Sequence, residues 1–381
     1  MRYAAGLRVS VGLVPESEAL SALPVTDPFD VDAGPATPLS RFTTFRVGGP
    51  AARIVTATET GDVIDAVAAA DAADEPLLVL GGGSNLLVAD AGFDGTVVRI
   101  AGEGIVPESA DHCGGAVVRV APGQVWDDVV VRAVAEGWTG VEALSGIPGS
   151  TGATPLQNVG AYGQEVAETI AAVRTWDRLE GRIRTVAGPD CGFAYRTSRF
   201  KTERYRGGPR YVVLDVTFQF EIGDLSRPVR YAELANALGV AIGDRAPLAD
   251  VRDAVLALRA RKGMVLDPDD HDTWSAGSFF TNPVLDAAAA AALPEGAPRW
   301  PVDGDLVKTS AAWLIEHAGF TRGHGLPGPA SLSTKHTLAL TNRGSATAAD
   351  LVALAREVRD GVRERFGVEL SPEPVLVGLT L

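Results

Sequence analysis

The chain has 381 residues, of which 46% are hydrophobic and 22% charged, and its formal net charge is −14. That length allows two or three domains, and that composition excludes an intrinsically disordered chain. No apolar run approaches the roughly 18 residues that a membrane-spanning helix needs. So acidic a chain is poorly suited to bind nucleic acid or anionic lipid over a broad surface. An anionic ligand therefore requires a local cluster of cations and backbone N–H groups.

The counts of four residue types and the composition of the N-terminus narrow the class of protein further. The two cysteines, Cys113 and Cys191, form no Cys-x-x-Cys pair, so neither a zinc site nor a disulfide framework is expected. The N-terminus lacks an apolar run long enough for a secretory signal, and we expect a cytoplasmic protein. Arginine outnumbers lysine by 30 to 4, and there are only five asparagines. The skew suggests that lysine is replaced wherever the physics permits, so the four remaining lysines are candidate functional residues, although chance also explains them: Lys201, Lys262, Lys308 and Lys335.

The predicted elements follow an N-terminal extension, residues 1–37, that is rich in Pro, Asp and Ala and shows no clear period. Strands are predicted at 43–57 with a turn at 48–50, and at 76–80, 86–90, 96–100, 116–121, 170–176, 181–186 and 211–220. Helices are predicted at 60–74 and 125–136. The composition of the chain changes near residue 230, where a second α+β unit is predicted to begin. Its predicted helices are 231–238, 248–262, 309–318 and 348–366, and its predicted strands are 338–341 and 368–381.

The segment Gly81-Gly82-Gly83-Ser84-Asn85 joins two predicted strands. Glycines let the backbone turn sharply and bring N–H groups close to a phosphate. A Rossmann dinucleotide fingerprint would open a helix, and none is predicted here, so that fold is disfavoured. A loop between strands still suits a pyrophosphate, although an ordinary glycine turn explains the segment equally well when it is taken alone.

A second glycine-rich segment, residues 144–163, has the sequence LSGIPGSTGATPLQNVGAYG. Its glycines are interleaved with Ile147, Leu156 and Val159, which favours a buried loop packed on a flat ligand over a mobile surface linker. Two such segments indicate a large cofactor. One molecule that carries adenine, pyrophosphate and isoalloxazine would span both.

Three further segments concentrate polar side chains. Residues 193–201, with the sequence FAYRTSRFK, contain three cations and a tyrosine. The sequence SAGSFFTNP places Ser278 in an apolar setting, and FGVELSPEPV places Glu373 between two prolines. Taken singly, these are also explained as a solvated loop, a packed serine and a surface carboxylate.

A hydrolase is not supported by the sequence. No Gly-x-Ser-x-Gly elbow surrounds Ser278. His271 and His317 likewise lack the sequence context of a catalytic triad.

The chain contains five motifs in this order: GGGSN, SGIPGSTGATPLQNVGAYG, YRTSRFK, SAGSFFTNP and FGVELSPE. Together they resemble the motifs of the UDP-N-acetylenolpyruvoylglucosamine reductase (MurB) family, over roughly residues 38–381. The resemblance implies an α+β fold. It consists of a two-subdomain FAD-binding part of the vanillyl-alcohol-oxidase/PCMH type and a C-terminal α+β substrate-binding domain. The implied boundaries are 1–37 for the N-terminal extension, 38–105 and 106–225 for the two FAD-binding subdomains, and 226–381 for the substrate-binding domain with its catalytic C-terminal segment.

The resemblance also implies an activity, the NADPH-dependent reduction of UDP-N-acetylglucosamine enolpyruvate to UDP-N-acetylmuramate by an oxidoreductase with non-covalent FAD. This step belongs to peptidoglycan precursor synthesis, and thus to cell-wall biogenesis, cell shape and cell division. No metal, nucleic acid, membrane or obligatory protein partner is implied.

Site residues carry over from the same resemblance, residue by residue. The implied catalytic residues are Arg196, Ser278 as the proton donor, and Glu373. The implied cofactor-binding residues are Gly81, Gly82, Gly83, Ser84, Asn85, Ser145, Gly146, Ile147, Gly149, Gly152, Asn158, Gly160 and Ala161. The implied substrate-binding residues are Tyr162, Tyr195, Tyr231, Arg259, Lys262 and Asn282. Tyr231 resembles the substrate tyrosine of the subclass with the longer insert. The sequence departs from the family pattern in two places. The spacing from Lys262 to Ser278 is wider than is usual in the family, and Pro374-Val375 stands where the family has Val-Arg.

Two other classes of function remain open at this point. Another FAD-dependent oxidoreductase of the same fold, an alcohol or hydroxy-acid oxidase, would produce hydrogen peroxide and often hold its flavin covalently through His or Cys. Neither residue type occurs in 81–85 or 144–163. A non-catalytic module that binds nucleotide sugars would leave Arg196, Ser278 and Glu373 without a role.

Overall fold

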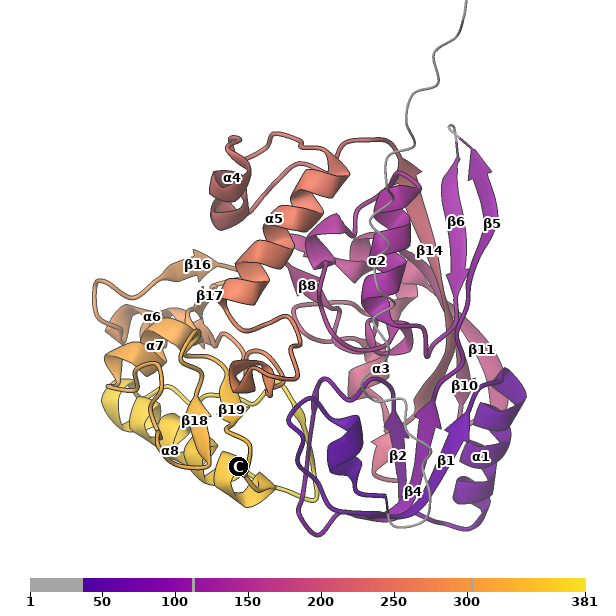
Figure 1. Ribbon diagram of the computed structural model, residues 1–381, viewed down its shortest axis with the longest axis horizontal. Helices are drawn as coiled ribbons and strands as arrows, with labels where there is room; N and C mark the ends of the chain where they lie inside the picture. Colours follow the sequence, from indigo (N-terminus) through magenta and orange to yellow (C-terminus); the bar gives the residue numbers. More distant parts are fainter. Residues whose placement is uncertain (1–36, 112–113, 303) are drawn as a thin grey trace, which may run out of the picture.

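The computed structural model describes residues 37–111, 114–302 and 304–381. The predicted N-terminal extension therefore lies outside the described residues, apart from residue 37. Figure 1 shows two sheet-containing units on one side of the molecule, coloured indigo to magenta, and a C-terminal unit on the other side, coloured orange to yellow. Within the described ranges, no helix is long and apolar enough to cross a membrane.

The first unit is a parallel sheet in the order β1-β4-β2, with β1 (Ala51–Ala57), β2 (Leu77–Leu80) and β4 (Phe93–Ile100). Helix α1 (Thr60–Ala72) packs on it and begins at a capping box formed by Glu59 and Asp62. The strand predicted from residue 43 begins only at Ala51. Arg46 and Gly48 have positive φ angles of 55° and 122°, which interrupt extended backbone.

The second unit is an antiparallel sheet in the order β11-β10-β14-β6-β5, with β7 paired to the end of β14. Its strands are β5 (Ile105–Asp111), β6 (Gly115–Val120), β7 (Trp138–Thr139), β10 (Ile170–Asp177), β11 (Arg182–Ala187) and β14 (Tyr211–Ile222). Helix α2 (Trp126–Ala135) covers one face, where the rings of Trp126 and Phe218 lie 5.9 Å apart. Strand β5 is absent from the sequence prediction because every residue after Ile105 is exposed, so it has no apolar period.

Helices α4 (Ala232–Leu238) and α5 (Leu248–Arg261) follow β14 and pack on this second unit. Val251 and Val255 share a buried cluster with Ala143 of the short helix η2 (Glu142–Leu144). Arg252 also donates two hydrogen bonds, of 2.8 and 2.7 Å, to the carboxylate of Asp127 in α2. The first half of α5 is therefore fixed against α2 and against η2, which leads into the second glycine-rich segment.

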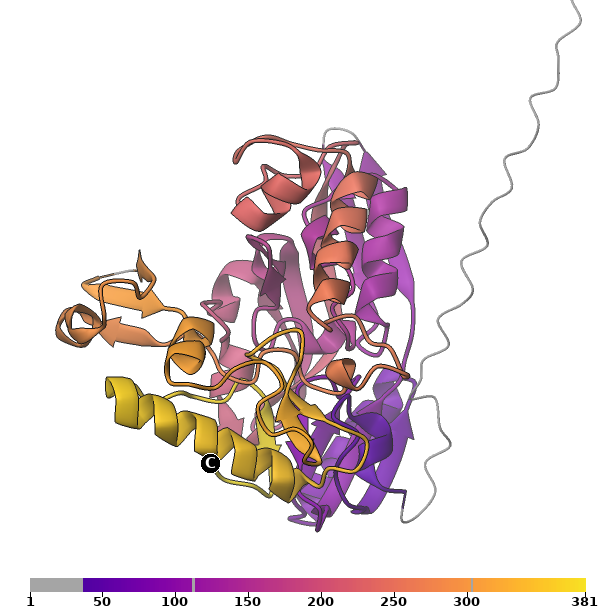
Figure 2. The same ribbon diagram turned by 60° about the vertical axis from the view of Figure 1, so that its left-hand side comes forward.

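The C-terminal unit surrounds helix α8 (Ala348–Phe366), whose capping box uses Thr347 and Asp350. Its core also includes Phe45 and Leu87 from the first unit. Its other elements are β15 (Val284–Asp286), α6 (Ala287–Ala292), β16 (Arg299–Pro301), β17 (Leu306–Thr309), α7 (Ala311–His317), β18 (Ala330–Leu332) and β19 (Leu340–Asn342). The sheet β15-β17-β16, which the sequence analysis does not predict, projects to the left in Figure 2.

The last strand crosses back to the first unit. Strand β20 (Val375–Val377) pairs in parallel with β3 (Leu86–Val88), and the backbone N–H of Val375 donates to the carbonyl of Asn85 at 2.9 Å. Of the strand predicted at 368–381, only β20 is extended in a sheet. This pairing places Glu373 next to the first glycine-rich segment.

The helices predicted at 60–74, 125–136, 231–238, 248–262, 309–318 and 348–366 are all present, with ends that differ by two residues or fewer. The remaining short elements are η1 (Leu39–Phe42), η3 (Thr151–Ala153), β8 (Gly160–Ala161), β9 (Gln164–Glu165), η4 (Val166–Glu168), η5 (Gly188–Cys191), α3 (Arg199–Thr202), β12 (Arg204–Tyr205), β13 (Gly208–Pro209) and η6 (His271–Thr273).

Candidate active site

A cavity of about 870 Å³ lies where the three units meet. Segments of all three contribute to its wall, including both glycine-rich segments. The predicted site residues that line it are Gly81, Gly82, Gly83, Ser84, Asn85, Ile147, Gly149, Gly160, Ala161, Tyr162, Tyr195, Arg196, Tyr231, Arg259, Lys262, Ser278, Asn282 and Glu373. Residues from distant parts of the sequence thus form one site.

The two glycine-rich segments touch each other inside this cavity. Ser84 Oγ donates to the carbonyl of Pro148 at 3.0 Å, and the N–H of Gly82 donates to Ser150 Oγ at 3.4 Å. A Cβ on Gly82 would lie 2.7 Å from the Cα of Gly149, so a larger residue does not fit there. A wall of small residues lets a pyrophosphate approach the backbone closely.

Four of the predicted cofactor-binding residues do not line the cavity. The Ser145 hydroxyl and the backbone N–H groups of Gly146 and Gly152 donate to other groups of the protein at 2.6 to 2.8 Å. Asn158 is buried, and its side-chain amide donates to the Glu165 carboxylate at 2.7 Å. These residues fix the shape of the loop, and direct contact between them and a cofactor stays a prediction.

Tyr195 and Arg196 form the tip of a tight turn. The residues on either side exchange backbone hydrogen bonds of 3.1 and 3.2 Å, and Arg196 has a left-handed φ of 54°. Arg196 Nη2 donates to the carbonyl of Gly160 at 2.8 Å, which anchors the guanidinium to the second glycine-rich segment. Arg196 Nε lies 3.2 Å from Glu373 Oε1 but is not aligned for a hydrogen bond, so this buried N–H has no acceptor. A planar guanidinium with an unused donor suits a substrate carboxylate.

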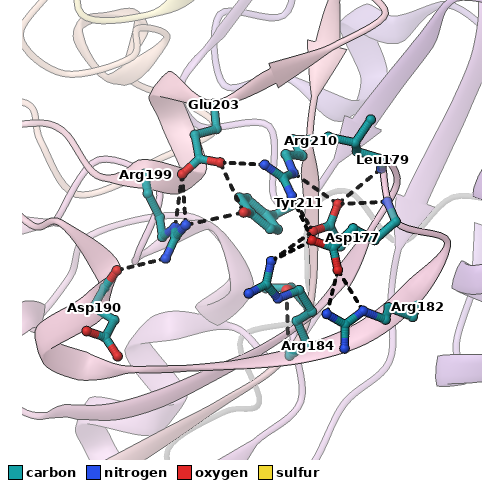
Figure 3. A network of polar contacts seen from close by, with 11 residues as sticks. Asp177, Leu179, Arg182, Arg184, Asp190, Arg199, Glu203, Arg210 and Tyr211 are labelled. Carbon is teal, nitrogen blue, oxygen red and sulfur yellow. Dashed lines mark hydrogen bonds and ion pairs between the residues drawn. The ribbon is translucent and has the colours of Figure 1, made fainter.

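A network of charged side chains surrounds α3, which follows this turn in the sequence (Figure 3). Arg199, just after the turn, donates to Glu203 at 2.9 Å, and Glu203 also accepts from Arg210 and Tyr211, each at 3.0 Å. Arg210 donates in addition to the fully buried carboxylate of Asp177 at 2.7 Å. Burial acts to raise the pKa of Asp177, but the hydrogen bond and charge of Arg210 together with the backbone N–H groups of Leu179 and Glu180 outweigh it, so the pKa is lowered. The network fixes α3 and the base of the turn.

Ser278 and Glu373 are brought to the same wall by pairing between their segments. The N–H of Glu373 donates to the carbonyl of Phe279 at 2.8 Å, one residue beyond Ser278. The side-chain amide of Asn85 donates to the carbonyl of Glu373 at 3.3 Å. The predicted proton donor and the predicted C-terminal acid therefore face a cavity that the first glycine-rich segment also lines.

The charges around Glu373 are mainly positive. Burial raises the pKa of Glu373, and the positive charges of Arg196 and Lys201 act in the opposite direction. Lys201 lines the cavity, and its Nζ donates to the carbonyl of Arg196 at 3.0 Å. Two cations and one carboxylate leave a positive charge that one further anion would balance.

A second polar group lies on the α4–α5 side of the cavity. The rings of Tyr162 and Tyr231 meet edge to face at 5.6 Å, and Lys262 Nζ lies 5.7 Å from the centre of the Tyr162 ring. Lys262 Nζ is paired with Glu233 at 2.6 Å. Burial lowers the pKa of Arg259 to about 10, and its Nε has no hydrogen-bond partner. Aromatic rings and cations in this arrangement suit a nucleoside diphosphate.

Asn282 connects the Tyr195 turn to the C-terminal unit. It lies close enough to the phenol of Tyr195 to act on its pKa, and its Oδ1 accepts from the N–H of Ala311 at 2.9 Å. Lys308 Nζ lies 4.9 Å from the centre of the Tyr195 ring. Asn282, Tyr195 and Lys308 thus lie together in the wall of the cavity.

Three cavity residues, Lys201, Lys308 and His336, have no role in the sequence prediction. The scarcity of lysine in the sequence points to Lys201 and Lys308, whereas no sequence signal points to His336. Burial lowers the pKa of His336 to about 4. In the described parts of the chain, Lys201, Arg259 and Lys308 line the cavity without a carboxylate in ion-pair range. They are the local positive charge that an anionic ligand needs in a chain of net charge −14.

Comparison with known proteins identifies the family. Residues 51–187 match the model of an FAD binding domain, and residues 267–377 match that of the C-terminal domain of UDP-N-acetylenolpyruvoylglucosamine reductase. The reductase of Cutibacterium acnes is 56% identical over 353 residues, which are 92% of this chain and 92% of the relative. The chain belongs to the UDP-N-acetylenolpyruvoylglucosamine reductase family.

Further relatives match this chain along nearly its whole length. The UDP-N-acetylenolpyruvoylglucosamine reductase of Streptomyces coelicolor is 56% identical over 355 residues, 90% of each chain. The crystal structure of the Thermus caldophilus MurB reductase matches with a TM-score of 0.59 and 26% identity, over 90% of this chain and 97% of that one. The expected family, the α+β fold and its FAD-binding part are confirmed. Assignment to the subclass with the longer insert stays a prediction.

Proposed function

We propose that the protein catalyses the NADPH-dependent reduction of UDP-N-acetylglucosamine enolpyruvate to UDP-N-acetylmuramate, with FAD as the hydride carrier. The observation that carries the proposal is the convergence of Arg196, Ser278 and Glu373 on one cavity that both glycine-rich segments also line. Relatives that are 56% identical bear the name of this reductase. The same proposal includes a place in peptidoglycan precursor synthesis in the cytoplasm, where NADPH is available.

The residues of the cavity fit FAD. Gly82 and Gly149 pack so closely that a Cβ on Gly82 would meet the backbone of the second segment, and residues 81–85 and 147–161 would hold the pyrophosphate and the flavin ring. When bound, FAD accepts a hydride from NADPH and supplies one to the substrate. Because these segments contain no His or Cys, we propose that FAD is held without a covalent bond.

Arg196 and Glu373 would act on the carboxylate of the enolpyruvyl group. As a hydride reaches the β-carbon, the electrons of the double bond move toward the α-carbon and the carboxylate. The unsatisfied Nε of Arg196 donates to that carboxylate and stabilises the growing charge. Glu373 lies beside the same guanidinium, so Glu373 and the substrate carboxylate would share the positive charge of Arg196.

Ser278 would complete the reaction. Its hydroxyl lies in the cavity wall beside two buried phenylalanines and donates its proton to the α-carbon. One hydride and one proton are then added across the double bond, which gives the lactyl ether of the product.

The α4–α5 side of the cavity would bind the UDP part of the substrate. Tyr231 is 47% exposed and meets Tyr162 edge to face, so its ring is available to cover a bound nucleotide. Lys262 and Arg259 supply positive charge for the diphosphate. This role for Tyr231 is what the subclass with the longer insert would require.

The test uses the purified flavoprotein under anaerobic conditions. NADPH should bleach the flavin, and UDP-N-acetylglucosamine enolpyruvate should restore the colour with formation of an equal amount of UDP-N-acetylmuramate. Restoration by oxygen with hydrogen peroxide, but not by the enolpyruvyl substrate, would support an oxidase and contradict the proposal. A colourless protein that binds nucleotide sugars without turnover would support the non-catalytic module.

A further inference from the structure

Lys201 lies on α3, five residues after Arg196, and reaches back to the turn. Its Nζ donates to the main-chain carbonyl of Arg196 at 3.0 Å. That carbonyl belongs to a residue with a left-handed φ of 54°, a conformation that costs free energy in a residue other than glycine. The hydrogen bond from Lys201 therefore stabilises the turn that presents Arg196.

The helix that carries Lys201 is fixed by other contacts. The buried Ser198 donates through its hydroxyl to the carbonyl of Leu156 at 2.7 Å. Arg199 is paired with Glu203 at 2.9 Å. Lys201 thus extends from a rigid base, and its ammonium group is not needed to hold α3 in place.

Charge gives Lys201 a second role. In the described part of the chain, the groups whose charge or ionisation acts on Glu373 are Arg196, Lys201 and the phenol of Tyr195. Arg196 is the ion-pair partner of Glu373, at 3.2 Å. A substrate carboxylate bound to Arg196 adds a second negative charge, which two cations balance and one cation does not.

We propose that Lys201 is a positioning residue of this active site. It holds the Arg196 turn through the main-chain carbonyl, and it supplies the second positive charge that lets Glu373 and the substrate carboxylate lie together. The inference rests on the proposed function, because the enolpyruvyl substrate brings that carboxylate. Lys201 acts through Arg196 and Glu373 and transfers no proton.

Three variants of the full-length flavoprotein separate the two roles. Lys201→Arg keeps the donor and the charge, Lys201→Gln keeps a donor without the charge, and Lys201→Met removes both. Arg363→Met removes one exposed cation on α8 and is the matched control. Flavin absorbance checks the folding of each variant. If Lys201→Met does not fold, the comparison of Lys201→Gln with Lys201→Arg still tests the role of the charge.

The first measurement is a pH titration of Glu373 by NMR on glutamate labelled at the carboxyl carbon, assigned with Glu373→Gln. It requires no substrate. Loss of a nearby positive charge destabilises a carboxylate, so the Glu373 inflection should move to higher pH in Lys201→Gln and Lys201→Met. It should stay at its wild-type position in Lys201→Arg and in Arg363→Met.

The second measurement is flavin reoxidation by the enolpyruvyl substrate as a function of pH. Its Glu373 inflection should move in the same direction, whichever protonation state is active. In Lys201→Met the maximal rate should fall by about tenfold to a hundredfold, as expected for the loss of a charged hydrogen bond. Lys201→Gln should lose less, because it keeps a donor, and flavin reduction by NADPH should change least.

Each outcome decides one part of the inference. An unchanged Glu373 inflection in Lys201→Gln would overturn the role of the charge. A Lys201→Arg variant as slow as Lys201→Met would overturn the positioning role. A wild-type protein whose reduced flavin is not reoxidised by the substrate would contradict the proposed function instead, and the NMR titration would still decide whether Lys201 sets the ionisation of Glu373.

Discussion

The side-chain amide of Asn85 donates a hydrogen bond to the backbone carbonyl of Glu373, 3.3 Å away. The same amide donates to Gln157 at 2.9 Å, and the carbonyl of Asn85 accepts from the N–H of Val375 at 2.9 Å. One residue of the first glycine-rich segment thus holds the segment that carries the C-terminal acid. The cofactor cradle and the substrate-facing carboxylate are therefore built as one unit.

Replacement of Asn85 with Ala should loosen this connection. We expect flavin reoxidation by the enolpyruvyl substrate to slow by about tenfold, as for the loss of one or two neutral hydrogen bonds, and the bound flavin to dissociate more readily. Stopped-flow absorbance and the flavin content after gel filtration measure the two effects. Asn236→Ala, at an exposed position of α4, is the matched control. Wild-type values for both measurements in Asn85→Ala would contradict the account.

Gly82→Ala should give protein that retains little or no flavin. A Cβ at this position would lie 2.7 Å from Cα of Gly149 and 3.1 Å from N of Ser150, so the two glycine-rich segments would have to separate. Gly61→Ala, where the new Cβ meets no atom within 4 Å, should retain its flavin. The ratio of flavin to protein absorbance gives the answer. Full flavin content in Gly82→Ala would show that the contact does not shape the cradle.

Lys262→Ala should raise KM for the enolpyruvyl substrate by about tenfold to a hundredfold through the loss of a charged contact to phosphate, while flavin reduction by NADPH suffers less. Glu233→Gln should not raise this KM, because it frees Lys262 from its carboxylate partner at 2.6 Å. Lys335→Ala removes a lysine that is paired with Asp270 outside the cavity wall, and it controls for the loss of charge. An unchanged KM in Lys262→Ala would mean that other cations bind the diphosphate of the substrate.

His336 should make stability depend on pH. Burial and the charge of Lys262 lower its pKa to about 4 from an ordinary 6.5. Below pH 6.5 His336 binds a proton in the unfolded chain but stays neutral in the folded protein. The free energy of unfolding therefore falls as the pH drops, by up to about 3 kcal/mol at pH 4.

Urea unfolding at several pH values tests this dependence. His336→Gln should show a shallower loss of stability than wild type between pH 6.5 and 4. His317→Gln, at an exposed position of α7, is the matched control and should follow the wild type. Equal slopes for His336→Gln and wild type would show that folding does not lower the pKa of His336.

The sequence predicted which residues line the cavity better than it predicted their contacts. Periodicity located the helices, and small or charged residues in ordered motifs pointed to Gly82, Arg196 and Ser278, all of which line the cavity. The scarcity of lysine was informative as well, because Lys201 and Lys308 line the same cavity. Lys335 lies outside the cavity wall, so the scarcity of lysine indicates candidate positions and does not by itself assign a role.

The packing of segments that are far apart in the chain could not be predicted from the sequence. The pairing of β20 with β3 joins segments that are nearly 290 positions apart, and no local pattern encodes it. Ser145 and Asn158 lie within a glycine-rich motif, yet they bond to the protein behind the cavity, because a motif does not say which way each residue points. The domain boundaries at 105 and 225 stay predictions.

The most direct test of the account concerns the proton that Ser278 is proposed to give. Reduction of the flavin by NADPH requires no proton at the substrate's α-carbon, so Ser278→Ala should keep rapid bleaching. Reoxidation by UDP-N-acetylglucosamine enolpyruvate should slow by about 10²–10⁴-fold, the usual contribution of a general acid, and Ser278→Cys should recover part of that rate. Stopped-flow absorbance follows the two half-reactions separately. Equal slowing of both half-reactions, or none in either, would contradict Ser278 as the proton donor.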